Sequence, residues 1–297
     1  MINSNEKPLS VIHVDVDSLW TIKQDFGHQA YDKDCLAYKE SIPHFLELFE
    51  SEKIKATFFA IGNDAKHNIS ADMIHKMATK GHEIGNHTMN HRTDFSNISL
   101  KEMINEITEC DSILSEVTNT NIIGFRSPGY YFKYQLIETL LKLGYKYDTS
   151  SLPTILLPLM NLIHIYLSKF KNTNKQLGSI RDVLRGIKPY YLNSQGTMSS
   201  ISTSDGILVI PITVTPILRL PFHSTVVFST GERYFDMSIR LVKMFNLPLI
   251  YLFHAIDLFP DLNYKDEINH PTIRSSFLKR YDMVKNIIKS IKKNYNI

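Results

Sequence analysis

Short apolar segments alternate with amphipathic stretches along the 297-residue chain, and this alternation is what most constrains its fold. It is typical of a largely parallel sheet whose strands are joined by helices that lie outside the sheet. The sequence therefore predicts an α/β fold. We expect seven strands, at residues 10–17, 56–61, 83–87, 122–126, 145–149, 207–212 and 248–254.

Helix-boundary signals between these segments support the prediction. Ser70 is placed to cap a helix that stops at Gly81, and Ser99 with Glu102 forms a capping box for the next helix. Two further helices are predicted at residues 232–245 and 273–293.

Length and composition agree with a single globular domain. A chain with 43% hydrophobic and 21% charged residues can bury one large core. Because neither a repeat nor a clean linker divides the sequence, we predict one domain over residues 1–297, with a variable insertion at about 151–205. The formal charge of +3 is too weak to indicate a nucleic-acid partner.

The cysteines and the first residues bear on the compartment. Cys35 and Cys110 provide neither a disulfide framework nor a Cys-x-x-Cys thiolate cluster. Residues 1–10 are polar where a secretory signal would place its apolar stretch. We expect a cytoplasmic protein.

The first chemical signal is the sequence His13-Val14-Asp15-Val16-Asp17 at the end of the first strand. Alternate residues of a strand share a face, so Asp15 and Asp17 project together with Cα atoms about 6.6 Å apart. Carboxyl ends of parallel strands are where barrel active sites are built. Two solvated acids at a strand end are the equally weighted alternative.

The second signal is His87-Thr88-Met89-Asn90-His91, which follows the third strand. Histidines four residues apart meet on one turn of helix, and with Asp17 they would give a metal ion three ligands and an open position for water. The same spacing also arises by chance in a chain with 12 histidines.

Three further strand ends carry polar residues. Arg126 offers a fixed fork of donors that would hold a carboxylate such as Asp15 ionised and oriented. Gly129 permits a turn whose backbone N–H groups approach a substrate oxygen. His254 would protonate a departing amine, with Asp148 favouring the charged form of its imidazole. Read singly, these are an ordinary loop, a satisfied core histidine and a capping aspartate.

In order and spacing these residues resemble the polysaccharide deacetylases, the family with NodB homology that is also called carbohydrate esterase family 4. The resemblance covers residues 10 to 260 and implies a distorted (β/α) barrel of about seven strands. Its motifs are matched by the Asp15 and Asp17 pair, by His87 and His91, by Arg126 to Gly129, by Asp148 and by His254.

The resemblance implies a metal-dependent enzyme that removes an N-acyl group from an amino sugar, and we expect this group to be acetyl. Asp17, His87 and His91 would bind a divalent ion, which we expect to be zinc. Asp15 would act as the base and His254 as the acid.

Two departures from the family pattern bear on this reading. Asp-x-Asp followed by Ser18 replaces adjacent aspartates followed by Gly-Pro, and Gly129 followed by Tyr130 replaces an aromatic residue. The oxyanion donor is therefore expected among the backbone groups of Gly129 and Tyr130.

The Asp-x-Asp variant resembles the intracellular and the peptidoglycan or lipid-carrier branches of the family. The polar first residues argue against an extracellular wall deacetylase, and the resemblance then favours a sugar on undecaprenyl phosphate, as in lipid A modification. Residues 158–171 combine a wide apolar face with following basic residues, as in a helix that lies on an anionic membrane. Packing on the barrel or in a dimer explains the same pattern. A peptidoglycan-type or small-sugar deacetylase and an inactive carbohydrate-binding protein are the alternatives.

Overall fold

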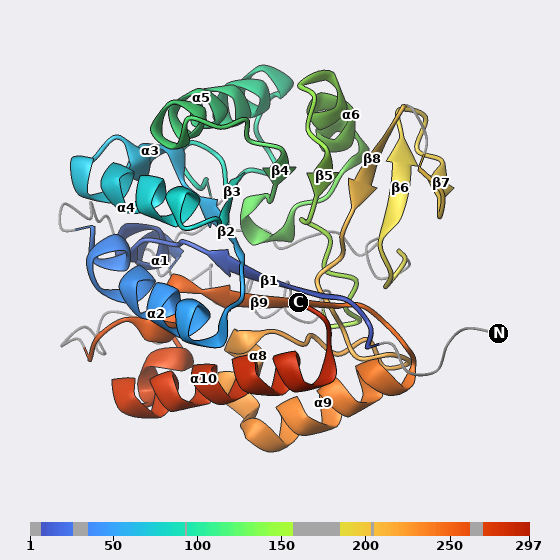
Figure 1. The fold of residues 1–297 in the computed structure, drawn as a ribbon. Helices are drawn as coiled ribbons and strands as arrows, with labels where there is room; N and C mark the ends of the chain where they lie inside the picture. The colour runs from blue at the N-terminus through green and yellow to red at the C-terminus, as the bar shows by residue number, and fades with distance from the viewer. Residues whose placement is uncertain (1–6, 26–34, 93, 157–184, 203–204, 262–269) are drawn as a thin grey trace, which may run out of the picture.

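The structure, a computed structural model, describes residues 7–25, 35–92, 94–156, 185–202, 205–261 and 270–297 (Figure 1). Nine strands form one sheet in the order β7-β6-β8-β5-β4-β3-β2-β1-β9. The strands are β1 (Ser10–Asp15), β2 (Thr57–Ala60), β3 (Glu83–Asn86), β4 (Gly124–Phe125), β5 (Tyr147–Asp148), β6 (Tyr190–Asn193), β7 (Met198–Ser199), β8 (Gly206–Val209) and β9 (Leu249–His254).

The seven predicted strands are all present and pair in parallel, so the predicted fold class is confirmed. Each is shorter than expected. The antiparallel strands β6 and β7 were not predicted. They lie in the expected insertion, where only alternate residues of β6, Tyr190 and Leu192, are buried.

Segments that follow β5 and β8 close the parallel strands into a distorted barrel. The backbone N–H groups of Ile210 and Ile212 donate to the carbonyls of Asp148 and Ser151, and that of Thr213 donates to Ile250 in β9 at 3.2 Å. The chain after β8 therefore fills the gap between the two ends of the parallel sheet.

Helices flank the strands, and Figure 1 shows α4, α5 and α6 beside β2 to β5 and α2, α9 and α10 beside β1 and β9. Within the described residues, none of the helices has the length and apolarity needed to cross a membrane. The helices are α1 (Leu19–Asp25), α2 (Ile42–Glu52), α3 (Gly62–Ala65), α4 (Asn68–Thr79), α5 (Leu100–Thr118), α6 (Tyr134–Lys142), α8 (Ser224–Thr230), α9 (Glu232–Met244) and α10 (Phe277–Asn294), with short turns η1 (Ala37–Ser41), η2 (Pro128–Tyr130), η4 (Ala255–Leu258) and η6 (Thr272–Arg274).

Helix starts were predicted with mixed success. The capping box of Ser99 and Glu102 is confirmed at the start of α5. The predicted cap at Ser70 is wrong, because α4 begins at Asn68 and Ser70 is buried inside it. The last helix begins at Phe277 and not at residue 273, because residues 272–274 form a separate short turn.

Two glycines let aromatic rings enter the sheet. A Cβ at Gly85 would lie 2.5 Å from the ring of Phe59, and a Cβ at Gly124 would lie 2.2 Å from the phenol of Tyr147. The polar side chains of the site gather at the carboxyl ends of the strands, where β1, β3, β4 and β9 finish.

Candidate metal and catalytic site

The predicted metal ligands come together at the carboxyl ends of β1 and β3. Asp17, His87 and His91 each offer one ligand atom, and these atoms lie within 4.8 Å of one another. Oδ1 of Asp17 is 3.4 Å from Nε2 of each histidine. Two imidazole nitrogens and one carboxylate oxygen are a ligand set that suits zinc and leaves an open position.

The prediction that the two histidines share a turn of helix is wrong. β3 ends at Asn86, and the residues after it form a loop in which Thr88 and His91 have φ of 66° and 44°. Left-handed backbone is uncommon for residues with a side chain and persists only where neighbours hold it. Tertiary contacts, and not helical spacing, therefore bring the two imidazoles together.

Two helices hold this histidine loop. At the start of α3, the N–H groups of Gly62 and Asn63 donate to the carbonyls of Thr88 and Met89 at 3.1 and 2.8 Å. In α5, the carboxylate of Glu106 accepts bonds from both the backbone and the side chain of Asn90.

The helix α3 also holds the loop that carries Asp17. The buried carboxylate of Asp64 accepts hydrogen bonds from the hydroxyl of Ser18 at 2.6 Å and from the indole of Trp20 at 2.8 Å. One short helix thus fixes the two loops that supply the ligands. We call Asp17, His87 and His91, with these loops, the metal half of the site.

The protonation states of His87 and Asp17 favour the binding of a cation. Nδ1 of His87 lies 2.7 Å from the carbonyl oxygen of Arg126, so a proton on Nδ1 leaves the Nε2 lone pair toward Asp17. Burial would raise the pKa of Asp17, but His91 and His87 outweigh it and hold that pKa well below its usual range. The carboxylate is therefore ionised.

Asp15 lies beside this cluster against a buried guanidinium. Nε of Arg126 is 3.3 Å from Oδ1 of Asp15, and its Nη2 donates to Nδ1 of His13 at 2.6 Å and to Thr149 at 3.1 Å. Burial raises the pKa of Asp15 to about 6, although Arg126 opposes the rise. His13 was not predicted as a site residue, although the two-residue period of β1 places it on the face of Asp15 and Asp17.

His254 ends β9 on the other side of Asp15. Its Nε2 is 4.0 Å from Oδ2 of Asp15, and its Nδ1 is 3.5 and 3.4 Å from the hydroxyls of Ser224 and Thr225. Its backbone N–H donates to the carboxylate of Asp257 at 2.9 Å. We call His254, Asp257 and residues 223–225 the acid half of the site.

The structure contradicts the predicted pairing of Asp148 with His254. The carboxylate of Asp148 accepts bonds from the hydroxyl and the backbone N–H of Ser150, at 2.6 and 3.1 Å. Asp257 is the carboxylate that binds His254, and Ser224 also bonds to it. Its position three residues after His254, as in a capping box, is a signal that sequence reasoning missed.

Gly129 and Tyr130 form the turn η2 directly after Arg126. Both have left-handed backbone, with φ of 62° and 59°. The ring of Tyr130 packs 6.3 Å from that of His223, so this turn lies between β4 and the acid half.

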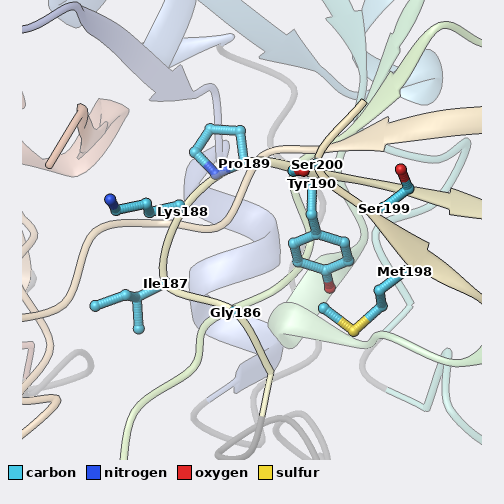
Figure 2. A pocket seen from close by; sticks show the side chains of 8 residues that line it. All are labelled: Gly186, Ile187, Lys188, Pro189, Tyr190, Met198, Ser199 and Ser200. Atoms are coloured by element: carbon cyan, nitrogen blue, oxygen red, sulfur yellow. The ribbon is translucent and has the colours of Figure 1, made fainter. Parts of the chain in front are cut away.

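A pocket of about 380 Å³ lies elsewhere, beside β6 and β7 (Figure 2). Figure 2 shows the side chains of Tyr190 and Met198 on one side of it and Ile187 and Pro189 on the other. None of the predicted site residues lines it, so it is separate from the candidate site.

The family model of the polysaccharide deacetylases matches residues 28–147, so this part of the chain is similar to that family. Among curated relatives, a peptidoglycan-N-acetylglucosamine deacetylase of Bacillus cereus is 34% identical over 104 residues, which are 35% of this chain and 47% of the relative. A peptidoglycan deacetylase of Helicobacter pylori is 23% identical over 179 residues, which are 59% of this chain and 60% of the relative. The chain thus spans about half the length of the curated relatives it matches.

Solved structures agree on the fold. A protein from Mycobacterium smegmatis assigned to the polysaccharide deacetylases aligns with a TM-score of 0.59 at 12% identity, over 97% of this chain and 85% of that protein. The allantoinase Puue aligns with a TM-score of 0.60 at 14% identity, over 98% and 86% of the two chains. At this level of identity the likeness concerns the barrel alone.

Proposed function

We propose that this protein is a metal-dependent hydrolase that removes an N-acyl group, in our expectation acetyl, from an amino sugar. The observation that carries the proposal is the meeting of Asp17, His87 and His91 beside Asp15 and His254. A divalent ion held by the first three residues would lower the pKa of a bound water and polarise the acyl carbonyl.

In this proposal Asp15 takes the proton from the attacking water. Its carboxylate is oriented by Arg126, which is itself held by His13 and Thr149. A base works best with a pKa near the operating pH, and the raised value of about 6 for Asp15 suits that task.

His254 then protonates the leaving nitrogen. Burial lowers the pKa of His254 to about 3, so its imidazole is neutral before the reaction. The proton that it delivers must therefore arise in the reaction, and the carboxyl of Asp15, whose Oδ2 lies 4.0 Å from Nε2, would supply it once the two groups come within hydrogen-bond distance or share a water. Backbone N–H groups of Gly129 and Tyr130 are the proposed donors to the oxyanion.

The names of the relatives favour N-acetylglucosamine in a glycan as the substrate, because two of them are peptidoglycan deacetylases. The experiment is to incubate the purified protein with N-acetylglucosamine oligosaccharides and measure acetate by an enzyme-coupled assay. Metal-dependent acetate release is expected. Binding without release would favour the alternative of an inactive carbohydrate-binding protein.

An amino sugar on polyprenyl phosphate, as in lipid A modification, remains our more specific prediction. It depends on the predicted amphipathic helix 158–171, which lies outside the described residues. Leu162→Asp combined with Tyr166→Asp is expected to weaken liposome binding and turnover of a lipid-linked substrate while sparing a soluble analogue. An equal loss of turnover on both substrates would contradict the membrane role of this segment, and with it the prediction of a peripheral cytoplasmic enzyme.

A further inference from the structure

His223 has a buried imidazole with two unused hydrogen-bonding atoms. The residue is 4% exposed, and within the described part of the chain neither Nδ1 nor Nε2 has a hydrogen-bond partner. Buried polar groups are nearly always paired, because desolvating one without a partner is unfavourable. An imidazole left in this state therefore calls for a functional explanation.

Its neighbours place it in the acid half. The ring centroid of His223 is 6.1 Å from that of His254 and 6.3 Å from that of Tyr130. The next two residues, Ser224 and Thr225, direct their hydroxyls toward Nδ1 of His254. The unpaired nitrogens of His223 thus lie next to the imidazole of His254, the group that would protonate the leaving amine.

The imidazole is uncharged, which decides what it can bind. Burial lowers the pKa of His223 to about 4, and Arg126 and His270 add to the effect. A neutral imidazole has one N–H donor and one acceptor lone pair. A sugar hydroxyl both donates and accepts, so it can pair with either ring nitrogen, whereas a phosphate or carboxylate only accepts and can pair with the N–H alone.

We propose that His223 binds a ring hydroxyl of the amino sugar whose acyl nitrogen faces His254. The inference rests on the proposed function and names a substrate contact that the five family motifs do not contain. The hydroxyl supplies a hydrogen-bond partner that one of the ring nitrogens lacks in the free protein.

The test compares His223→Phe with His223→Gln. Phenylalanine keeps an aromatic ring of similar size but forms no hydrogen bond, whereas glutamine keeps a donor and an acceptor. With N,N′,N″-triacetylchitotriose, the phenylalanine variant is expected to raise KM about tenfold, the effect of one or two lost hydrogen bonds. The glutamine variant is expected to stay near the wild-type KM.

Deoxy analogues of the trisaccharide identify the hydroxyl. Removing the contacted hydroxyl should weaken binding to the wild type but not to His223→Phe, because the two changes delete the same interaction. Binding is measured by calorimetry in an Asp15→Asn background, so the readout does not depend on turnover. Should His223→Phe fail to fold, the analogue series on the wild type and on His223→Gln provides the comparison.

The outcomes separate this inference from the proposed function. Equal trisaccharide affinity of the wild type and His223→Phe overturns the role of His223 even if the enzyme is active. A fall in kcat with unchanged KM in both variants also overturns it, because that result indicates proton relay to His254. Failure of the wild type to release acetate counts against the proposed function, whereas the calorimetric comparison still decides on His223.

Discussion

The metal half and the acid half of the site are built differently. In the metal half, backbone N–H groups of α3 and side chains of Asp64 and Glu106 hold both ligand loops with bonds of 2.6 to 3.1 Å. In the acid half, the polar contacts of the His254 ring are 3.4 to 4.0 Å long. The ring nitrogens of the adjacent His223 have no hydrogen-bond partner among the described residues.

This difference suggests a division of labour. The metal half is held by hydrogen bonds before any ligand arrives, which suits a site that must impose coordination geometry. The acid half retains unused hydrogen-bonding groups, which suits a surface that a sugar completes. The predictions below test this contrast, beginning with the largest expected effect.

Loss of a metal ligand should abolish activity. In His87→Ala or His91→Ala, two ligands remain, so the ion is lost and turnover falls by more than about 10,000-fold, beyond the range for acid–base residues. Metal content by mass spectrometry and acetate release are the measurements. His75→Ala, at an exposed position of α4, is the matched control. A histidine variant that keeps both metal and turnover would contradict the assignment.

Changes to the proton-transfer residues should spare the metal. Asp15→Asn and His254→Ala are expected to lower kcat about 100- to 10,000-fold with one equivalent of metal retained, because neither residue is assigned as a ligand. Near-normal turnover in either variant would remove that residue from its role, and loss of metal would show that the two halves are not separable.

Asp148→Asn should change how stability depends on pH. Burial raises the pKa of Asp148 from 3.8 to about 7, so the folded protein binds this proton more tightly than the unfolded chain does. The contribution of Asp148 to the free energy of unfolding is therefore full below pH 3.8 and falls by about 1.4 kcal/mol per pH unit up to about 7.

Asparagine removes this dependence while it can still accept a bond from Ser150. Urea unfolding of the metal-free protein at about pH 5 and about pH 8 measures the difference, with the exposed Asp72→Asn as control. An identical pH dependence in the wild type and Asp148→Asn would show that the carboxyl is not held protonated.

Asp64→Ala should weaken metal binding without removing a ligand. The substitution deletes the bonds to Ser18 and Trp20 that fix the Asp17 loop, and changes behind the ligands typically cost 10- to 100-fold in metal affinity. The metal affinity of Asp64→Asn, which keeps one acceptor oxygen, should lie between those of the wild type and Asp64→Ala. Competition with a fluorescent zinc chelator measures the affinity, and unchanged affinity would show that α3 does not organise the site.

Residues that lie next to strands were predictable from the sequence because of the regular geometry of parallel sheets. Asp15, Asp17, His87, Arg126 and His254 all lie at the carboxyl ends of predicted strands, and parallel strands end at the same edge. The capping box at Ser99 was predictable for a similar reason, since its geometry is local.

Contacts between residues that are far apart in the sequence were not predictable in this way. Asp64 meets Ser18 through a contact 46 residues away, and no local pattern indicates it. The assignment of Asp148 to His254 failed because the carboxylate of Asp148 bonds to Ser150 within its own loop, whereas Asp257 lies within the turn that follows β9. The hairpin of β6 and β7 escaped prediction because its strands are only four and two residues long.

The most direct test of the central claim is to strip the purified protein with a chelator and titrate zinc back while measuring acetate released from N-acetylglucosamine oligosaccharides. We predict that activity is absent in the stripped protein, rises linearly, and reaches a plateau at one equivalent of zinc. The Asp15→Asn variant should bind the same equivalent without releasing acetate. Full activity in the stripped protein, or zinc uptake by a His87→Ala and His91→Ala double variant with wild-type stoichiometry, would contradict the account.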